Sequence, residues 1–182
     1  MVQIIGDAIS GKEVRSLPQS LWRAEQIRAL EREWAEREGL ALYTLMERAG
    51  AALRTYATHH WPHSRCWWIF TSPGNNGGDG WVAADILSHK GVDVDIVSPV
   101  EPDEIPAALA RHVARRTAGR DVHVCVGPSR DELEVLIDKA DVVVDAIFGT
   151  GFHGDLRAPF SIWIPTDRKS TRLNSSHRCL SR

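Results

Sequence analysis

The stretch Cys66-Trp-Trp-Ile-Phe-Thr-Ser-Pro-Gly-Asn-Asn-Gly-Gly-Asp-Gly80 decides the fold. Its first six residues form a largely apolar run that ends before a proline and a glycine, which is typical of a strand buried on both faces of a parallel sheet. A helix is expected from about Gly78 to Lys90, with Gly91 as its stop. The stretch therefore predicts a strand, a glycine-rich loop and a helix in succession.

The chain after this stretch keeps alternating between strand and helix patterns. Short apolar or period-two runs predict strands, and the segments between them have helical spacing. Such alternation requires right-handed crossovers, which give a mostly parallel sheet covered by helices on both faces, an α/β fold. The expected strands are 92–97, 122–126 and 141–148, and the expected helices are 106–116 and a segment from Ser129 or Asp131 to Lys139.

Two helices are expected before the sheet. Ile27, Leu30 and Trp34 recur at helical spacing between about residues 21 and 38, and Gly39 is a natural stop. A second helix follows, and its apolar stripe is interpreted as core packing. The members of that stripe are Leu42, Leu45, Met46, Ala49, Leu53 and Tyr56.

Two unusual loops are expected to lie next to each other. Loop 73–80 leaves the carboxyl end of the first predicted strand of the sheet, and loop 149–155 leaves the carboxyl end of the fourth. In the common doubly wound order 3-2-1-4 these two strands are neighbours at the point where the strand order reverses. Such folds bind their ligands there, so we expect the functional site at this edge.

The first loop has the composition of a ligand-binding segment. Its four glycines let the backbone come close to a ligand and take positive φ, and N–H groups at a helix start favour a phosphate. Asn75, Asn76 and Asp79 add oxygens that suit sugar hydroxyls or a hard cation. The alternative is a tight structural turn in which Asn and Asp tolerate awkward dihedral angles.

The second loop contains G-x-G-x-x-G at Gly149, Gly151 and Gly154. A dinucleotide fingerprint should end the first strand of its unit and open a helix, and this one follows the fourth strand. That context argues against an ordinary NAD-dependent dehydrogenase. Asp145 is the stronger signal, because a carboxylate inside an apolar strand is costly unless it is paired or bound. Pairing with an arginine or a backbone amide is the structural alternative.

Composition narrows the class of protein. The 182 residues are 43% hydrophobic and 25% charged, as in an ordinary globular protein, and no apolar run is long enough to span a membrane. The net charge is -2, which gives no reason to expect nucleic acid or an anionic membrane as a partner. The three cysteines are irregularly spaced, which favours reduced thiols and a cytoplasmic location.

The last sixteen residues differ from the rest. Segment 167–182 has neither helical nor strand periodicity. It holds five of the 22 basic residues and one of the 24 acidic residues. Residues 1–166 therefore have 17 basic and 23 acidic groups, which is a net charge of -6. Its first eleven residues resemble the translation of a common DNA-sequencing adapter. We interpret 167–182 as an artefactual tail, with a basic disordered tail as the alternative, and expect the domain to cover residues 15–166.

Four segments resemble the YjeF N-terminal domain family, the NAD(P)H-hydrate epimerases. They are Leu17-Pro-Gln-Ser, Leu45-Met-Glu-Arg-Ala-Gly50, Pro73-Gly-Asn-Asn-Gly-Gly-Asp-Gly80 and Val144-Asp-Ala-Ile-Phe-Gly-Thr-Gly151. The resemblance covers about residues 15–164. It implies a Rossmann-like three-layer α/β/α sandwich that interconverts the R and S forms of hydrated NADH and NADPH.

The resemblance also assigns roles to residues and implies partners. It implies a potassium ion held with the help of Asn76 and Asp145, a homodimer, and in some relatives an ADP-dependent dehydratase domain fused behind this one. It further implies that two sets of residues bind the hydrated nucleotide from opposite sides. These are Asn75, Asn76, Gly77, Gly78 and Asp79, and then Gly149, Thr150, Gly151, Phe152, His153, Gly154 and Asp155.

The sequence departs from the family pattern in two places. Ser72 stands where the family usually has glycine, which is a mild change. The family's Asp-Ile-Pro-Ser-Gly motif, whose aspartate is a candidate acid or base, is absent after the apolar segment 162–164, which resembles the approach to a strand. The catalytic residue is therefore not identified, and an impaired epimerase is expected. The alternative is a non-catalytic nucleotide-binding or dimerisation module of the same domain type.

Overall fold

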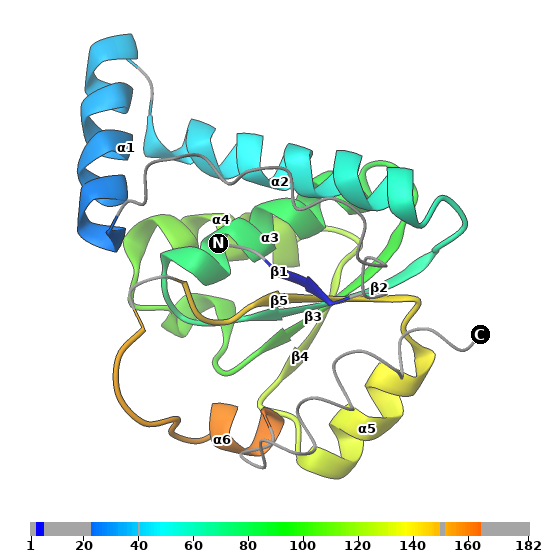
Figure 1. The fold of residues 1–182 in the computed structure, drawn as a ribbon. Coiled ribbons are helices and arrows are strands. Elements are labelled where there is room, and N and C mark those ends of the chain that lie inside the picture. The colour runs from blue at the N-terminus through cyan, green and yellow to red at the C-terminus, as the bar shows by residue number, and fades with distance from the viewer. Residues whose placement is uncertain (1–2, 6–22, 40, 150–151, 165–182) are drawn as a thin grey trace, which may run out of the picture.

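The computed structural model describes residues 3–5, 23–39, 41–149 and 152–164, and it shows a five-stranded sheet between two layers of helices (Figure 1). The strand order is β1-β5-β2-β3-β4. Strands β2, β3, β4 and β5 are parallel, and β1 pairs antiparallel with β5. The strands are β1 Gln3–Ile5, β2 Cys66–Thr71, β3 Asp93–Ser98, β4 His123–Val126 and β5 Val142–Ala146.

The helices divide between the two faces of the sheet. Helices α2, α3 and α4 cover one face, where the larger apolar core lies, and α5 and α6 cover the other (Figure 1). Helix α1 stands against α2, at the outside of the molecule. The helices are α1 Ala24–Glu38, α2 Leu42–His60, α3 Asn75–Ser88, α4 Ala108–Ala118, α5 Arg130–Lys139 and α6 Phe160–Trp163, with a short 3₁₀ helix, η1 Pro102–Glu104.

The predicted α/β architecture and the order of its four parallel strands are confirmed. Two predicted helix boundaries are also confirmed by their caps. Gly39 ends α1 in the left-handed conformation at φ 62°, and the Ser129 hydroxyl accepts from the N–H of Glu132 at the start of α5. Within the described ranges, no helix combines the length and the apolar character that a membrane crossing requires.

Strand β1 was not predicted. Its register places Ile4 opposite Val144, so the edge of β5 is paired along the central part of that strand. Three residues are too few to show a period, and they lie before residue 15, outside the predicted domain 15–166. The sheet consequently gains one antiparallel strand, β1, at its outer side next to β5.

The apolar stripe expected on α2 is partly wrong. Met46 and Leu53 are buried in the core as expected, and Ala57 is buried with them. Ala49 and Tyr56, by contrast, are exposed. The buried residues Met46, Gly50, Leu53 and Ala57 recur every three or four positions and form the inward face of α2. Ala49 and Tyr56 each precede one of these residues and so lie on a neighbouring face.

The strand approach expected at 162–164 is wrong, because these residues belong to or directly follow α6. Pro159 is the N-cap residue of this short helix. The two apolar residues Ile162 and Trp163 of the helix differ in burial. The Trp163 ring is buried and its Nε1 donates to the carbonyl of Pro128 at 3.1 Å, whereas Ile162 is 46% exposed. One helical turn places the tryptophan against α5, which an extended strand would not do.

Candidate functional site

The loops expected at 73–80 and 149–155, called the first and second motif segments below, meet at one edge of the sheet, as the predicted topology requires. Thr71 at the end of β2 lies opposite Ala146 at the end of β5, so both strands finish at the same level. Beyond these ends, a Cβ built on Gly149 would lie 3.4 Å from the Asn76 side chain. The order of strands reverses between β2 and β5, so this contact lies where doubly wound sheets bind ligands.

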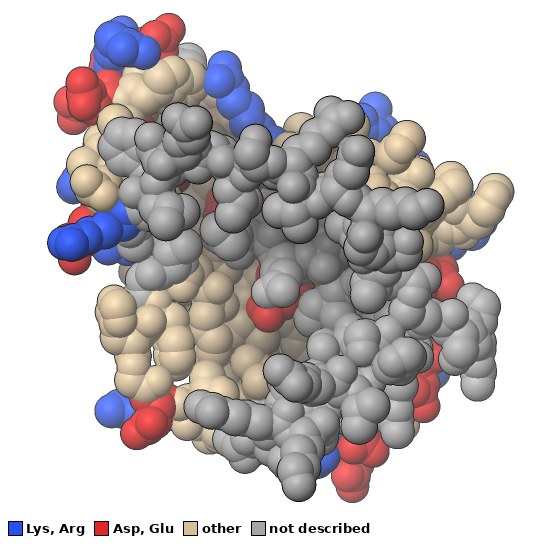
Figure 2. All heavy atoms as spheres, in the orientation of Figure 1, with Lys and Arg blue, Asp and Glu red and all other residues tan. Residues whose placement is uncertain are grey.

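This edge faces the left-hand side in Figure 1, where the chain after β5 runs down to α6. On the face in view, Figure 2 shows mainly uncharged described atoms at the left below α1, with acidic groups near the centre and at the lower left. An uncharged surface suits a ligand that is held by backbone N–H groups and side-chain amides rather than by ion pairs.

The first segment is the start of a helix, which corrects the loop expected before Gly78. Helix α3 begins at Asn75, with Gly74 as its N-cap residue. The first helical bond of the turn runs from the N–H of Gly78 to the carbonyl of Gly74 at 3.1 Å. The N–H groups of residues 75–77 have no carbonyl one turn earlier in the helix, so they are suited to an anion.

The glycines of this segment serve close packing and not the expected positive φ. None of them is among the described glycines with positive φ. A Cβ on Gly77 would lie 1.9 Å from the backbone oxygen of Ser72, and one on Gly80 would lie 2.8 Å from the Cβ of Ala146. A Cβ on Gly78 would lie 3.0 Å from Met46. Glycine is therefore required to seat the helix start against the strand ends.

Asp79 is the titratable group of the first segment. Burial is the main cause that raises its pKa from 3.8 to about 6, because desolvation disfavours the charged carboxylate. It lies one turn after Asn76, whose side chain is against Gly149. From the sequence, Asp79 is predicted only as a source of ligand oxygens, because no sequence signal gives its degree of burial. A carboxyl with this pKa can exchange a proton near neutral pH.

Asp145 lies half-buried on β5 and pairs with a backbone amide, as the structural alternative expected, and its metal role stays a prediction. Its Oδ1 accepts a hydrogen bond from the N–H of Ile147 at 2.9 Å. This bond fixes the carboxylate at the turn that leaves the strand. In the described ranges no group of three or more His, Cys, Asp or Glu side chains is arranged to hold a metal, so a cation here would depend on amide and carbonyl oxygens as well.

The second segment is at the surface. Phe152, His153, Gly154 and Asp155 are exposed, and the N–H of Phe152 donates to the carbonyl of Gly149 at 3.2 Å. Gly154 has φ 94°, a conformation that favours glycine. The predicted binding residues Thr150 and Gly151 lie outside the described residues, as does segment 17–20 of the family resemblance.

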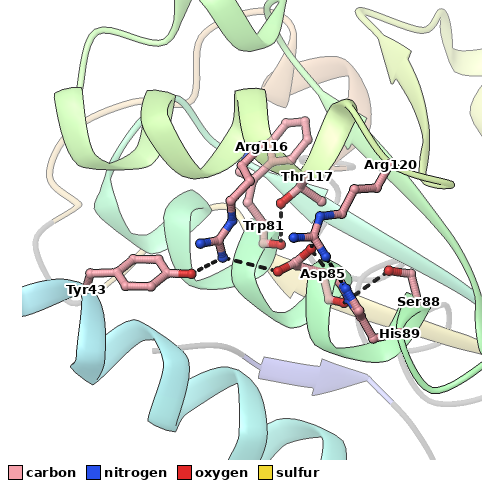
Figure 3. Close-up of polar contacts among 8 residues, drawn as sticks. All are labelled: Tyr43, Trp81, Asp85, Ser88, His89, Arg116, Thr117 and Arg120. Atoms are coloured by element: carbon pink, nitrogen blue, oxygen red, sulfur yellow. Dashed lines mark hydrogen bonds and ion pairs between the residues drawn. The ribbon is translucent and has the colours of Figure 1, made fainter.

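A second polar cluster lies farther along α3 and was not found from the sequence. Figure 3 shows the Asp85 carboxylate between Arg116 and Arg120 of the α4 region, with 3.1 Å to Nη2 of Arg116 and 3.3 Å to Nε of Arg120. Arg116 also donates to the hydroxyl of Tyr43 on α2. Asp85 is nine residues beyond Asn76, about 14 Å along a helix, so this cluster joins three helices and does not form part of the edge site.

Comparison with known proteins identifies a matching family profile and a solved structure of the same fold. The profile of the family described as YjeF-related protein N-terminus matches residues 42–174, a range that extends into the tail set aside above; that interpretation of the tail stays a prediction. The crystal structure of yeast YNL200c has the same fold, with a TM-score of 0.65 and 24% identity over 78% of this chain and 62% of that one.

Curated relatives carry related names. The Bifunctional NAD(P)H-hydrate repair enzyme Nnr of Escherichia coli is 38% identical over 142 residues, which cover 76% of this chain and 26% of that protein. The NAD(P)H-hydrate epimerase of Plasmodium vivax is 38% identical over 104 residues, 57% of this chain and 34% of that protein. The chain thus spans about a quarter to a third of these relatives. Because the profile matches well over half of its residues, the chain belongs to the YjeF-related protein N-terminus family.

Proposed function

We propose that this chain is an isomerase domain that interconverts the R and S epimers of hydrated NADH and NADPH in the repair of nicotinamide nucleotides. The observation that carries the proposal is the contact between Asn76 at the start of α3 and Gly149 after β5, at the reversal of strand order. It brings both family motifs to one edge. The names of the E. coli and Plasmodium relatives support the same reaction.

The residues present suit a dinucleotide. The N–H groups of residues 75–77 are suited to a phosphate, and the side chains of Asn75 and Asn76 can bond to ribose hydroxyls. Gly149 and residues 152–155 follow β5, and Gly154 supplies a turn in positive φ. Both segments are seated on strand ends, so the binding groups are positioned before the substrate arrives.

Asp79 is the group we assign to proton transfer. The hydrate carries its hydroxyl on the ring carbon next to nitrogen. When the neutral carboxyl donates a proton to that hydroxyl, water leaves and the nitrogen lone pair forms a C=N bond. Water then adds to the opposite face and returns a proton to the carboxylate. A carboxyl whose pKa is raised to about 6 can act in both directions.

A potassium ion is part of the proposal. The amide oxygen of Asn76 and the carboxylate of Asp145 are the mixed neutral and charged oxygens that can replace the water shell of such an ion, and both belong to the edge site. When bound, the ion supplies positive charge near the nucleotide. Asp145→Asn should therefore weaken the potassium dependence of ligand binding without unfolding the chain; identical potassium titrations of variant and parent would contradict the assignment.

Assembly and location complete the proposal. The family resemblance supports a homodimer, which light scattering can test. The word bifunctional in the relatives' names supports fusion to a dehydratase domain in the whole protein. Cys66 and Cys125 are free thiols, which supports a cytoplasmic location.

The experiment that tests the proposal is an epimerisation assay on the 182-residue chain. A single hydrate epimer is incubated with the chain in potassium or sodium buffer, and the other epimer is followed by chromatography against the spontaneous rate. Acceleration, greater in potassium, is expected. Nucleotide binding without acceleration would favour the alternative, a non-catalytic binding module.

A further inference from the structure

Four aromatic rings form a ladder from the core to the exposed Phe152 in the segment after β5, and the proton transfer proposed above does not use it. The Phe148 and Phe152 rings lie 4.1 Å apart between centroids at 33°. Phe148 in turn meets Phe160 at 4.9 Å, and Phe160 meets Trp163 at 5.4 Å. Trp163 is buried and its Nε1 donates to the carbonyl of Pro128 in the loop before α5, so the inner end of the ladder is fixed.

The outer end of the ladder is an exposed ring. Phe152 is 40% exposed although one of its faces packs on Phe148. Its backbone N–H donates to the carbonyl of Gly149, which holds the turn that carries the ring. The exposed part of the ring is therefore held in place by stacking and by the turn, and little side-chain freedom remains to be lost when a ligand binds.

The position of Phe152 connects the ladder with the nucleotide site. It follows Gly149 by three residues, and Gly149 is against Asn76 at the start of α3. An aromatic face beside helix N–H groups is a combination that can hold a flat ring while the N–H groups hold phosphate. A single exposed phenylalanine is ordinary, but one mounted on three further rings at a ligand edge has a binding role to test.

We propose that Phe152 stacks on the adenine ring of the nucleotide. This inference rests on the proposed function. The hydrated nicotinamide ring has tetrahedral carbons and is puckered, so it offers no flat face. Adenine is planar and fully aromatic, and it is the ring in the substrate that can stack on a phenylalanine. Because adenine is remote from the reacting carbon, the contact is equal for both epimers and for the transition state.

The test measures binding of AMP, which has adenine and phosphate but no nicotinamide, by calorimetry on the 182-residue chain. Phe152→Ala should weaken AMP binding by roughly five- to 150-fold, the range for loss of one base–aromatic stack. Phe152→Leu should weaken it nearly as much, and Phe152→Tyr should preserve it. Nicotinamide mononucleotide should bind equally to all four chains.

Ile162→Ala is the matched control, because Ile162 is equally exposed on the neighbouring α6 but has no ring. It should leave AMP binding unchanged, and circular dichroism should show every variant folded. In the epimerisation assay, Phe152→Ala should raise KM without lowering kcat. Unchanged AMP affinity in Phe152→Ala, full affinity in Phe152→Leu, or no AMP binding by the parent chain would each overturn the proposal. Phe152-dependent AMP binding without epimerisation would support the stack and contradict the proposed function instead.

Discussion

Asp79→Asn should stabilise the chain at neutral pH while it removes catalysis. The carboxyl of Asp79 has its pKa raised from 3.8 to about 6 by burial, so the folded state resists its ionisation. The shift is about two pH units, and each unit corresponds to 1.36 kcal/mol, so the charged carboxylate costs the fold up to about 3 kcal/mol at pH 7. An uncharged asparagine does not carry this cost.

The sign of the pH dependence follows from the direction of the shift. Between about pH 4 and pH 6 the folded chain holds the Asp79 proton more tightly than the unfolded chain, so the free energy of unfolding falls as pH rises through this window. Below pH 4 both states are protonated and the parent should match Asp79→Asn. Above pH 6 the variant should be more stable by the full difference.

Urea unfolding of parent and variant from pH 3.5 to pH 7.5, followed by tryptophan fluorescence, measures this difference. Asp155→Asn is the control, because Asp155 is an exposed carboxyl of the second motif segment and its substitution should change stability by less than about 0.5 kcal/mol. A stability difference between parent and Asp79→Asn that does not change with pH, or that grows toward low pH, would refute the reasoning. So would retention of full epimerisation by the variant.

Three further substitutions test other parts of the structure. Gly77→Ala should prevent stable folding, because its Cβ would lie 1.9 Å from a backbone oxygen. Gly74→Ala should fold, because the nearest atom to its Cβ would be a hydroxyl oxygen at 3.7 Å. Thermal melts of the two variants that coincide would contradict the packing role of the helix start. Asp85→Asn should lower the free energy of unfolding by about 1–3 kcal/mol, because it leaves two half-exposed arginines without their carboxylate. The control Asp103→Asn, which breaks an exposed ion pair, should lower it by less than about 1 kcal/mol. Equal losses in urea titrations would be evidence against the three-helix cluster. Asp141→Asn should lower the free energy of unfolding at neutral pH, because the Asp141 carboxylate accepts hydrogen bonds from the N–H groups at the start of β2, and these bonds lower its pKa. The difference between parent and variant should vanish only under strongly acidic conditions, below the ordinary pKa of the carboxyl. A difference that persists there would contradict this explanation.

The sequence contained enough information for the fold and for the meeting of the two motif segments. The apolar run of β2 and the valine-rich run of β5 have the composition of buried parallel strands, so their adjacency and the meeting of the two motif segments could be predicted. The boundary of α3 could not, because Asn and Gly disfavour helix by propensity and tertiary packing against Ser72 overrides that preference.

Other features depend on contacts that no local pattern records. The raised pKa of Asp79 arises from burial, and the aromatic ladder joins Phe148 and Phe152, which follow β5, to Phe160 and Trp163 of α6. The pairing of Asp85 with Arg116 spans 31 residues and depends on how α3 and α4 pack. Helix α6 was mistaken for a strand because four residues are too few to distinguish the two periods.

The most direct test of the central claim is the approach to equilibrium from both pure epimers. The R and the S forms of hydrated NADH are incubated separately with the chain, and the epimer ratio is followed by chromatography until it is constant. A catalyst changes the rate and not the end point, so both reactions should reach the epimer ratio of the spontaneous reaction. With the parent chain they should reach it faster than in buffer alone. With the Asp79→Asn variant they should be no faster than in buffer alone. Time courses with the parent chain that coincide with buffer from both directions would contradict the assignment of epimerisation to this site.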